Sequence, residues 1–80
     1  MAGTRQHKRN QHAINVLAKN IRKYRQQKGL TIQQLADMLD VDYSQIGRME
    51  RGTVNASVSI IFDIANLLEI SAKELLNEDD

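Results

Sequence analysis

Cysteine, proline and tryptophan are absent from this chain of 80 residues. The lack of cysteine excludes disulfides, thiolate metal sites and cysteine catalysis. The apolar runs are only a few residues long, so we expect no membrane-spanning segment. The chain also opens without the charged and apolar leader that is typical of a signal peptide. These absences favour a single small domain with a compact core and a cytoplasmic location.

Acidic residues are missing from the first 31 positions, although the whole chain contains 10 of them. The same segment contains eight basic residues, which are Arg5, Lys8, Arg9, Lys19, Arg22, Lys23, Arg25 and Lys28. Such a split suggests a polyanionic partner for one end of the molecule. A solvated run of charge is the alternative, and composition alone does not decide between the two.

Strand-like alternation is missing too, and the apolar residues instead recur at helical spacing. Residues 1–12 are polar and aperiodic, and we predict a disordered basic arm there, followed by a domain over residues 13–80. The first helix is predicted from Ala13 to Lys28. Capping residues mark the starts of four more helices, at Thr31 with Gln34, Asp42 with Gln45, Ser57, and Ser71 with Glu74. The sequence therefore predicts an all-α fold, a compact five-helix bundle.

The apolar stripes of these helices are expected to form the core. They consist of Ile14, Leu17, Ala18 and Ile21, then Ile32, Leu35, Ala36 and Leu39, then Ile46 and Met49, and finally Val58, Ile61, Ile64, Ala65 and Leu68. Only Asp40 and Val41 connect the second helix to the third, which starts at Asp42 and ends at Gly52. Two short helices joined so tightly must cross steeply, as in a helix-turn-helix unit, whereas a generic helical hairpin has longer helices.

The third helix has two unlike faces. At about 100° per residue, one arc holds Tyr43, Ser44, Gly47, Arg48 and Arg51, and the opposite arc holds Ile46, Met49 and Glu50. Polar groups of different lengths around a bare glycine suit the major groove, where donors reach base edges and backbone comes close. An ordinary solvent-facing surface is an equally good interpretation of this helix taken alone.

Two opposite charges fall on apolar faces. Arg25 lies in line with the apolar stripe of the first helix, and Glu50 with that of the third. A lone arginine in such a place is costly to bury, which suggests a buried or half-buried ion pair between the two residues. Two independent side chains that reach separately to solvent are the alternative.

The stretch from about Leu17 to Leu76 resembles the Cro/C1-type helix-turn-helix family, also called the xenobiotic-response-element family. The segments that resemble it are YRQQKGLT, TIQQLADMLDV, IGRMERG and ANLLEISAKELL. The resemblance implies a lambda-repressor-like DNA-binding domain in which Arg25 and Glu50 form a structural ion pair. Base contacts are expected from Tyr43, Ser44, Gly47 and Arg48. Phosphate contacts are expected from Thr31, Gln33, Gln45, Arg51, Thr53 and Arg22.

The chain departs from the family pattern at several positions. Ile32 stands where the family has glutamine, and Asp40 and Glu69 stand where it often has glycine. The proline that usually follows the third helix is missing. Together these departures indicate an operator sequence of its own.

The fourth helix is apolar over an unusually wide arc. Ile60 and Leu67 lie beside the core stripe, and with Phe62, Ile70 or Leu76 they are expected to form a self-complementary dimer interface. The alternative is that these residues only thicken a small core. A homodimer would present two recognition helices about 34–36 Å apart, on successive turns of the major groove.

The function indicated is a sequence-specific regulator of transcription that binds a palindromic double-stranded DNA operator. The alternative is a protein-binding module, such as an antitoxin or adaptor. An enzyme is not expected, because the only histidines, His7 and His12, lie in the predicted arm and no nucleophile and base converge. We also expect no cofactor, metal site, small-molecule ligand or membrane partner, and association with the nucleoid when DNA is bound.

Overall fold

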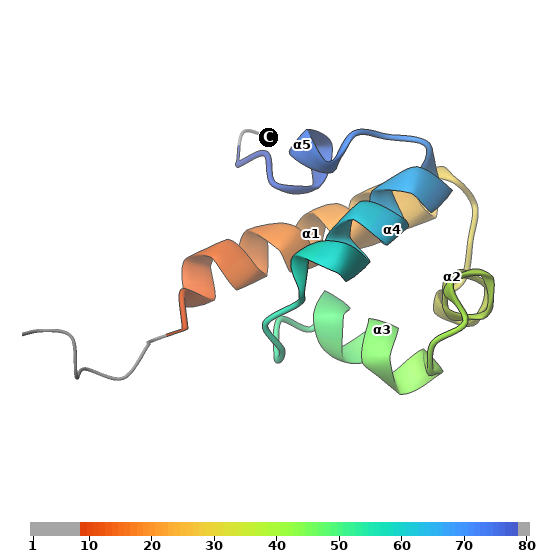
Figure 1. Cartoon of the computed structure of the whole chain (residues 1–80), viewed down its shortest axis with the longest axis horizontal. Helices are drawn as coiled ribbons and strands as arrows, with labels where there is room; N and C mark the ends of the chain where they lie inside the picture. Colours follow the sequence, from red (N-terminus) through yellow and green to blue (C-terminus); the bar gives the residue numbers. More distant parts are fainter. Residues whose placement is uncertain (1–8, 79–80) are drawn as a thin grey trace, which may run out of the picture.

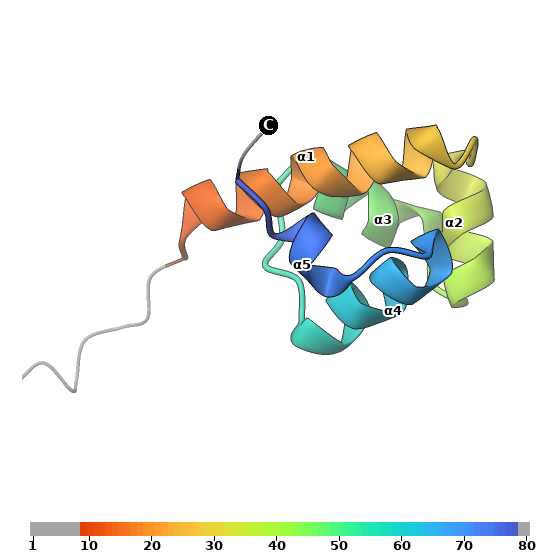
Figure 2. The same ribbon diagram turned by 90° about the horizontal axis from the view of Figure 1, so that it is seen from above.

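The computed structural model describes residues 9–78, and all the regular elements within that range are α-helices. They are α1 (Gln11–Gln27), α2 (Ile32–Leu39), α3 (Tyr43–Glu50), α4 (Val58–Leu68) and α5 (Ala72–Leu75). The predicted all-α class is thereby confirmed. The long helix α1 runs through the bundle, with α3 on one side of it and α5 on the other (Figure 1). Seen from above, α5 lies over α4 and against α1, and α2 closes the far end (Figure 2).

The first helix begins at Gln11 rather than at the predicted Ala13. Asn10 precedes it, and the Asn10 side chain accepts a hydrogen bond of 3.0 Å from the Ala13 amide. This cap satisfies one of the free amides of the first turn and extends the helix into the predicted arm. Gln11 and His12 therefore belong to α1, and residues 1–8 of the predicted arm lie outside the described residues.

Helix starts agree with the predicted caps only in part. Thr31 and Gln34 form a reciprocal capping box, and the Ser57 hydroxyl accepts from the Ile60 amide at 3.2 Å. The boxes predicted at Asp42 and Ser71 are wrong, because neither side chain makes a capping hydrogen bond. These helices start on backbone bonds instead, and the spacing of residue types does not reveal which rotamer a cap adopts.

Two helices end in a left-handed turn without glycine. Asp40 closes α2 and Glu69 closes α4, each at φ 60°. After each of them the next amide reaches back into the helix, from Val41 to the Ala36 carbonyl and from Ile70 to the Ala65 carbonyl, both at 3.0 Å. This is the C-terminal motif that glycine usually supports. Lys28 pairs with the exposed Glu69 carboxylate, and that hydrogen bond lowers the pKa of Glu69 below its ordinary value.

The core draws on every helix. Its largest fully buried side chains are Ile21, Leu35, Ile46, Ile64 and Leu75, one from each of the five helices. Val58 was expected in this core, but it is the first residue of α4 and 70% exposed. Helical spacing identifies the inward face of a helix, but it does not show whether neighbouring helices extend far enough to cover the first turn of that face. None of the described helices is long and apolar enough to cross a membrane.

Candidate nucleic-acid interface

The α2–α3 pair is the helix-turn-helix unit that the short connection predicts. Residues 40–42 link the two helices, and Asp40 supplies the left-handed residue that ends α2 so close to the start of α3. The inner side of α3 packs on α1 and α2 through the buried Ile46 and Met49. The fold therefore fixes which side of α3 remains available to a partner.

The outer side of α3 carries three of the four residues expected to contact bases. Tyr43 is 53% exposed, and Ser44 and Arg48 are exposed as well. Gly47 differs, because it is buried. The Arg51 side chain lies over it, with Nη1 3.1 Å from the place where a Cβ on Gly47 would stand. Close approach of DNA to the Gly47 backbone would thus require the Arg51 side chain to turn away.

Most of the residues expected to contact phosphates lie at the two ends of the α2–α3 unit. Thr31 and Gln33 lie at the start of α2, where Thr31 is part of the capping box and the Gln33 amide donates to Asp37 at 2.8 Å. After α3, Arg51 is exposed, and the Thr53 hydroxyl donates to the Arg48 carbonyl at 3.1 Å. Gln45, on α3 itself, is half-buried.

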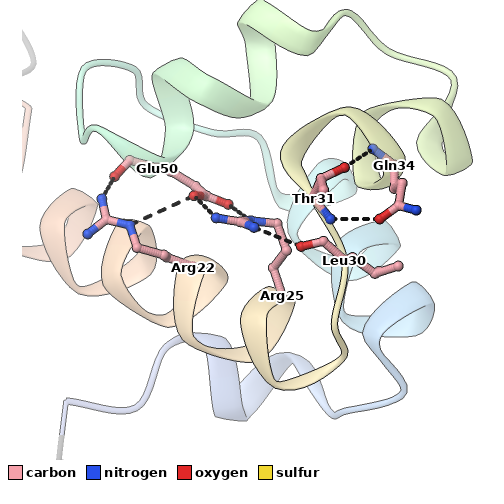
Figure 3. A network of polar contacts seen from close by, with 6 residues as sticks. All are labelled: Arg22, Arg25, Leu30, Thr31, Gln34 and Glu50. Carbon is pink, nitrogen blue, oxygen red and sulfur yellow. Dashed lines mark hydrogen bonds and ion pairs between the residues drawn. The ribbon is translucent and has the colours of Figure 1, made fainter.

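Arg25 and Glu50 meet in the interior between α1 and α3 (Figure 3). Arg25 Nε donates to Glu50 Oε2 at 2.6 Å, and Nη2 donates to Oε1 at 2.9 Å. A third bond, from Nη1 to the Leu30 carbonyl at 2.8 Å, ties the pair to the loop before α2. The residues are only 9% and 4% exposed, so the bidentate geometry compensates two desolvated charges. The hydrogen bond to Glu50 raises the pKa of Arg25 above its ordinary value against the opposing effect of burial.

Arg22 lies beside this pair (Figure 3). Its Nη2 donates to the Glu50 backbone carbonyl at 2.7 Å, and its Nε lies 3.8 Å from Glu50 Oε1. The sequence predicted a phosphate contact for this arginine as one of the basic residues of the first helix. In the free protein its guanidinium is directed at the end of α3 instead.

Asn20 is a structural residue that the sequence did not reveal. It is 5% exposed on α1, and its amide donates to the carbonyls of Leu75 and Asn77, each at 2.9 Å. These two bonds hold the end of α5 against α1. The one available signal was a polar side chain next to the apolar stripe of the first helix.

The residues of the expected dimer interface fall into two groups. Ile60, Leu67 and Ile70 are half-buried and pack against the core, whereas Phe62 is 54% exposed. Ile60 and Phe62 lie roughly 160° apart around α4, at 100° per residue. The four residues, of which Ile70 lies just after α4, therefore do not form one continuous surface. Val58 and Leu76, at 70% and 53% exposure, are further exposed apolar side chains on α4 and after α5.

Comparison with known proteins agrees with this geometry. Residues 21–75 match the helix-turn-helix family HTH_3. The chain is 40% identical over 60 residues to YazB of Bacillus subtilis (strain 168), an uncharacterized HTH-type transcriptional regulator, covering 75% of this chain and 87% of that protein. It is 30% identical over 66 residues to the HTH-type transcriptional regulator SinR of Bacillus licheniformis, covering 81% of this chain and 60% of SinR.

Two solved structures are similar throughout most of their length. One is the hypothetical transcription factor NHTF from Neisseria, with a TM-score of 0.79, 28% identity, and coverage of 91% of this chain and 85% of that one. The other is the restriction-modification controller protein C.AhdI from Aeromonas hydrophila, with a TM-score of 0.74, 34% identity, and coverage of 78% and 94%. The family match spans most of this chain and includes α2, α3 and the Arg25–Glu50 pair. The chain therefore belongs to the Cro/C1-type HTH_3 family of helix-turn-helix proteins, which are DNA-binding regulators of transcription and not enzymes.

Proposed function

We propose that the protein binds a palindromic double-stranded operator as a homodimer, with α3 of each protomer in the major groove. The observation that supports this most directly is the exposed polar face of α3, whose opposite face is fixed by the buried Arg25–Glu50 pair. A rigid helix with exposed donors is what direct recognition of base edges requires.

Arg48 is the residue most suited to recognise a base. It is exposed in the second half of α3, and a guanidinium bonds bidentately to the O6 and N7 acceptors of guanine. Tyr43 and Ser44 occupy the first turn, from which recognition helices commonly reach bases. Arg51 completes the arrangement if it moves from Gly47 to a phosphate, because this uncovers the Gly47 backbone at the same time.

Phosphate contacts on either side of α3 would set the orientation of the helix in the groove. Thr31 and Gln33 at the start of α2, Gln45 on α3, and Arg51 and Thr53 after it provide hydroxyl, amide and guanidinium donors. Only Arg51 among these carries a full charge. Among these residues, only Arg51 should therefore contribute to the salt dependence of DNA binding, at about −0.9 in the log–log slope for each phosphate neutralised.

The exposed apolar side chains of α4 and of the residue after α5 support dimerisation. Phe62 is the exposed member of the expected interface, whereas the half-buried Ile60 and Leu67 lie on the other flank of α4. Val58 and Phe62 lie four residues apart on α4 and so share one face, and contiguous exposed apolar surface commonly marks an interaction site. A symmetric pair would place two α3 helices on half-sites about one helical turn of DNA apart, and binding would locate the protein at the nucleoid.

Selection from a random duplex library, followed by salt titration of the selected site, tests this function. We expect a two-fold-symmetric site, and Arg48→Ala should abolish preference at one base position in each half-site, at a cost of ~1–3 kcal/mol. Gln26→Ala, a change at an exposed residue of α1, is the control. If the wild-type protein selects nothing above non-specific binding, the proposal fails, and a protein-binding module becomes the better hypothesis.

A further inference from the structure

The last turn of α3 is held by a row of side chains from α1. Gln11 Nε2 donates to the Gly52 carbonyl at 2.9 Å, and Arg22 Nη2 donates to the Glu50 carbonyl at 2.7 Å. Asn15 lies between them in sequence, and its Oδ1 accepts the second amide hydrogen of Gln11 at 2.9 Å. Gln11, Asn15 and Arg22 lie within an arc of about 40° on α1. We refer to these three residues as the α1 clamp.

The clamp binds backbone carbonyls at the C-terminal end of α3, where a helix leaves hydrogen-bond acceptors without partners. The last carbonyls of a helix have no partner within it, and they carry the negative end of the helix dipole. At the end of α3, the Glu50 carbonyl accepts from Arg22, and the Gly52 carbonyl, two residues beyond the helix, accepts from the neutral amide of Gln11. A cation at this end is favourable to the dipole, and the two bonds fix the turn relative to α1.

The contact at Gly52 is too close for a side chain. A Cβ on this residue would stand 2.7 Å from Asn15 Oδ1, and φ is +73°. The backbone just after α3 thus lies directly against the side chains of α1. The amides that follow the helix are ordered with it, since Thr53 N–H donates to the Arg48 carbonyl at 3.1 Å and Gly52 N–H to the Met49 carbonyl at 3.2 Å.

The two ends of α3 are therefore held by different parts of the molecule. Its first turn follows the short connection from α2, and the amides of Gln45 and Ile46 bond to the Asp42 carbonyl. Its last turn depends on the Arg25–Glu50 pair and on the α1 clamp. Figure 3 shows Arg22 and Arg25 on either side of the Glu50 carboxylate. The last turn also contains Arg48 and is followed by Arg51.

We infer that Gln11 and Arg22 are positioning residues that set the tilt of the C-terminal half of α3, and through it the base preference of Arg48. This rests on the proposed function. Loosening the clamp should free the last turn while the first turn stays in place. Arg22 then acts through the Glu50 carbonyl rather than by neutralising a phosphate.

Hydrogen exchange of the free protein, measured by NMR on the full chain, tests the clamp without DNA. In Gln11→Ala and in Arg22→Met, exchange at the Gly52 and Thr53 amides should become about 3- to 10-fold faster, the factor for one ordinary hydrogen bond. The Gln45 and Ile46 amides should change less than about 2-fold, by the same conversion. Arg22→Lys keeps a donor for the Glu50 carbonyl and should restore most of the protection.

Matched controls separate the clamp from general effects of mutation. Gln26→Ala removes an exposed amide from the same helix, and Lys73→Met removes one positive charge from α5, on the other side of α1 from α3. Neither should alter exchange at Gly52 or Thr53. Unchanged exchange at these two amides in both clamp variants would overturn the inference.

The selected operator then distinguishes positioning from a direct phosphate contact. Gln11→Ala should weaken base preference about 3- to 10-fold at the position that Arg48→Ala affects, and about 2-fold or less at positions near Tyr43 and Ser44. For Arg22→Met the log–log salt slope should equal that of Lys73→Met. A slope reduced by about 0.9 would assign Arg22 to a phosphate and overturn its positioning role. If the wild type selects no operator, the proposed function fails, whereas the exchange experiment still decides whether the clamp exists.

Discussion

Glu50 is the residue on which the orientation of α3 depends most. Its two carboxylate oxygens accept from Arg25, and its backbone carbonyl accepts from Arg22, so a single residue joins α3 to α1 through both its side chain and its main chain. At 4% exposure the carboxylate is nearly closed off from the bulk water that could replace these donors. The energetic consequence of losing it is therefore a buried, uncompensated arginine rather than the loss of one contact.

Replacing Glu50 by glutamine should destabilise the protein strongly. The change keeps the size of the side chain but removes the charge that compensates Arg25, and breaking a buried pair in this way typically costs about 3–5 kcal/mol. Urea denaturation gives the free energy of unfolding. Glu69→Gln is the matched control, because the Glu69–Lys28 pair lies at the surface and surface pairs contribute little. Equal effects of the two substitutions would contradict the structural role of Glu50.

Gly47 and Gly52 should respond in opposite ways to an added side chain, although one lies in α3 and the other just after it. A Cβ on Gly47 would meet only the end of the flexible Arg51 side chain, at 3.1 Å, and its backbone is helical. Gly47→Ala should therefore raise the free energy of unfolding by up to about 1 kcal/mol through helix propensity. It should also weaken operator binding if DNA approaches the backbone here. Thermal melting and operator titration of the same variant measure the two effects.

Gly52→Ala provides the comparison for that experiment. Its positive φ and the close Asn15 oxygen both oppose a side chain, so this variant should lose stability, by roughly 1–2 kcal/mol for the backbone conformation alone. A Gly47→Ala variant that is destabilised as much as Gly52→Ala would show that the cover by Arg51 is rigid.

At the scale of the elements, the sequence was most informative about local features. The Thr31–Gln34 box, the Ser57 cap and the helical class of each segment follow from residue types a few positions apart. The start of α1 was missed because Asn10 lies in a polar stretch without apolar periodicity. The boxes at Asp42 and Ser71 were wrong because spacing permits a cap without requiring its rotamer.

Contacts between distant elements were much harder to predict. Arg25 and Glu50 could be paired because each charge is anomalous on its own helix face. Gln11, Arg22 and Asn20 show no such anomaly, since a polar side chain on α1 suits solvent as well as a backbone carbonyl on α3 or α5. Their partners depend on how the helices are arranged in space, and neither composition nor periodicity contains that arrangement.

The attachment of α5 offers a test at this scale. Asn20→Ala removes both hydrogen bonds to the Leu75 and Asn77 carbonyls, which should cost about 1–3 kcal/mol. Because α5 is the shortest helix, the loss should appear first as faster hydrogen exchange in residues 72–77, before global unfolding is affected. Asn66→Ala, at an exposed position of α4, is the control. Unaltered exchange in residues 72–77 would exclude this role.

At the scale of the whole molecule, the two sides of α1 separate two tasks. The helix-turn-helix unit and the α1 clamp lie on the side of α3, whereas α5 and the segment after it lie on the other side (Figure 1). Of the large exposed apolar residues, Val58, Phe62 and Leu76 belong to α4 and to the end of α5, whereas Met38 and Tyr43 belong to α2 and α3. In the proposed homodimer, each protomer would use its α4–α5 side for the second copy, and its α3 side would remain free for DNA.

Phe62→Asp should separate these two tasks. A charge in the centre of an apolar interface opposes dimerisation, and the loss of a central aromatic contact commonly weakens association by about 2 kcal/mol or more. Light scattering over a range of concentrations should then show monomers, and the melting temperature should lose its dependence on concentration. Binding to a full operator should weaken while binding to a single half-site stays as in the wild type.

Met38→Asp, at an exposed apolar residue of α2 with 51% exposure, is the control and should leave the dimer intact. If Phe62→Asp remains dimeric, the interface must lie elsewhere, and the half-buried Ile60 and Leu67 on the other flank of α4 become the next residues to substitute.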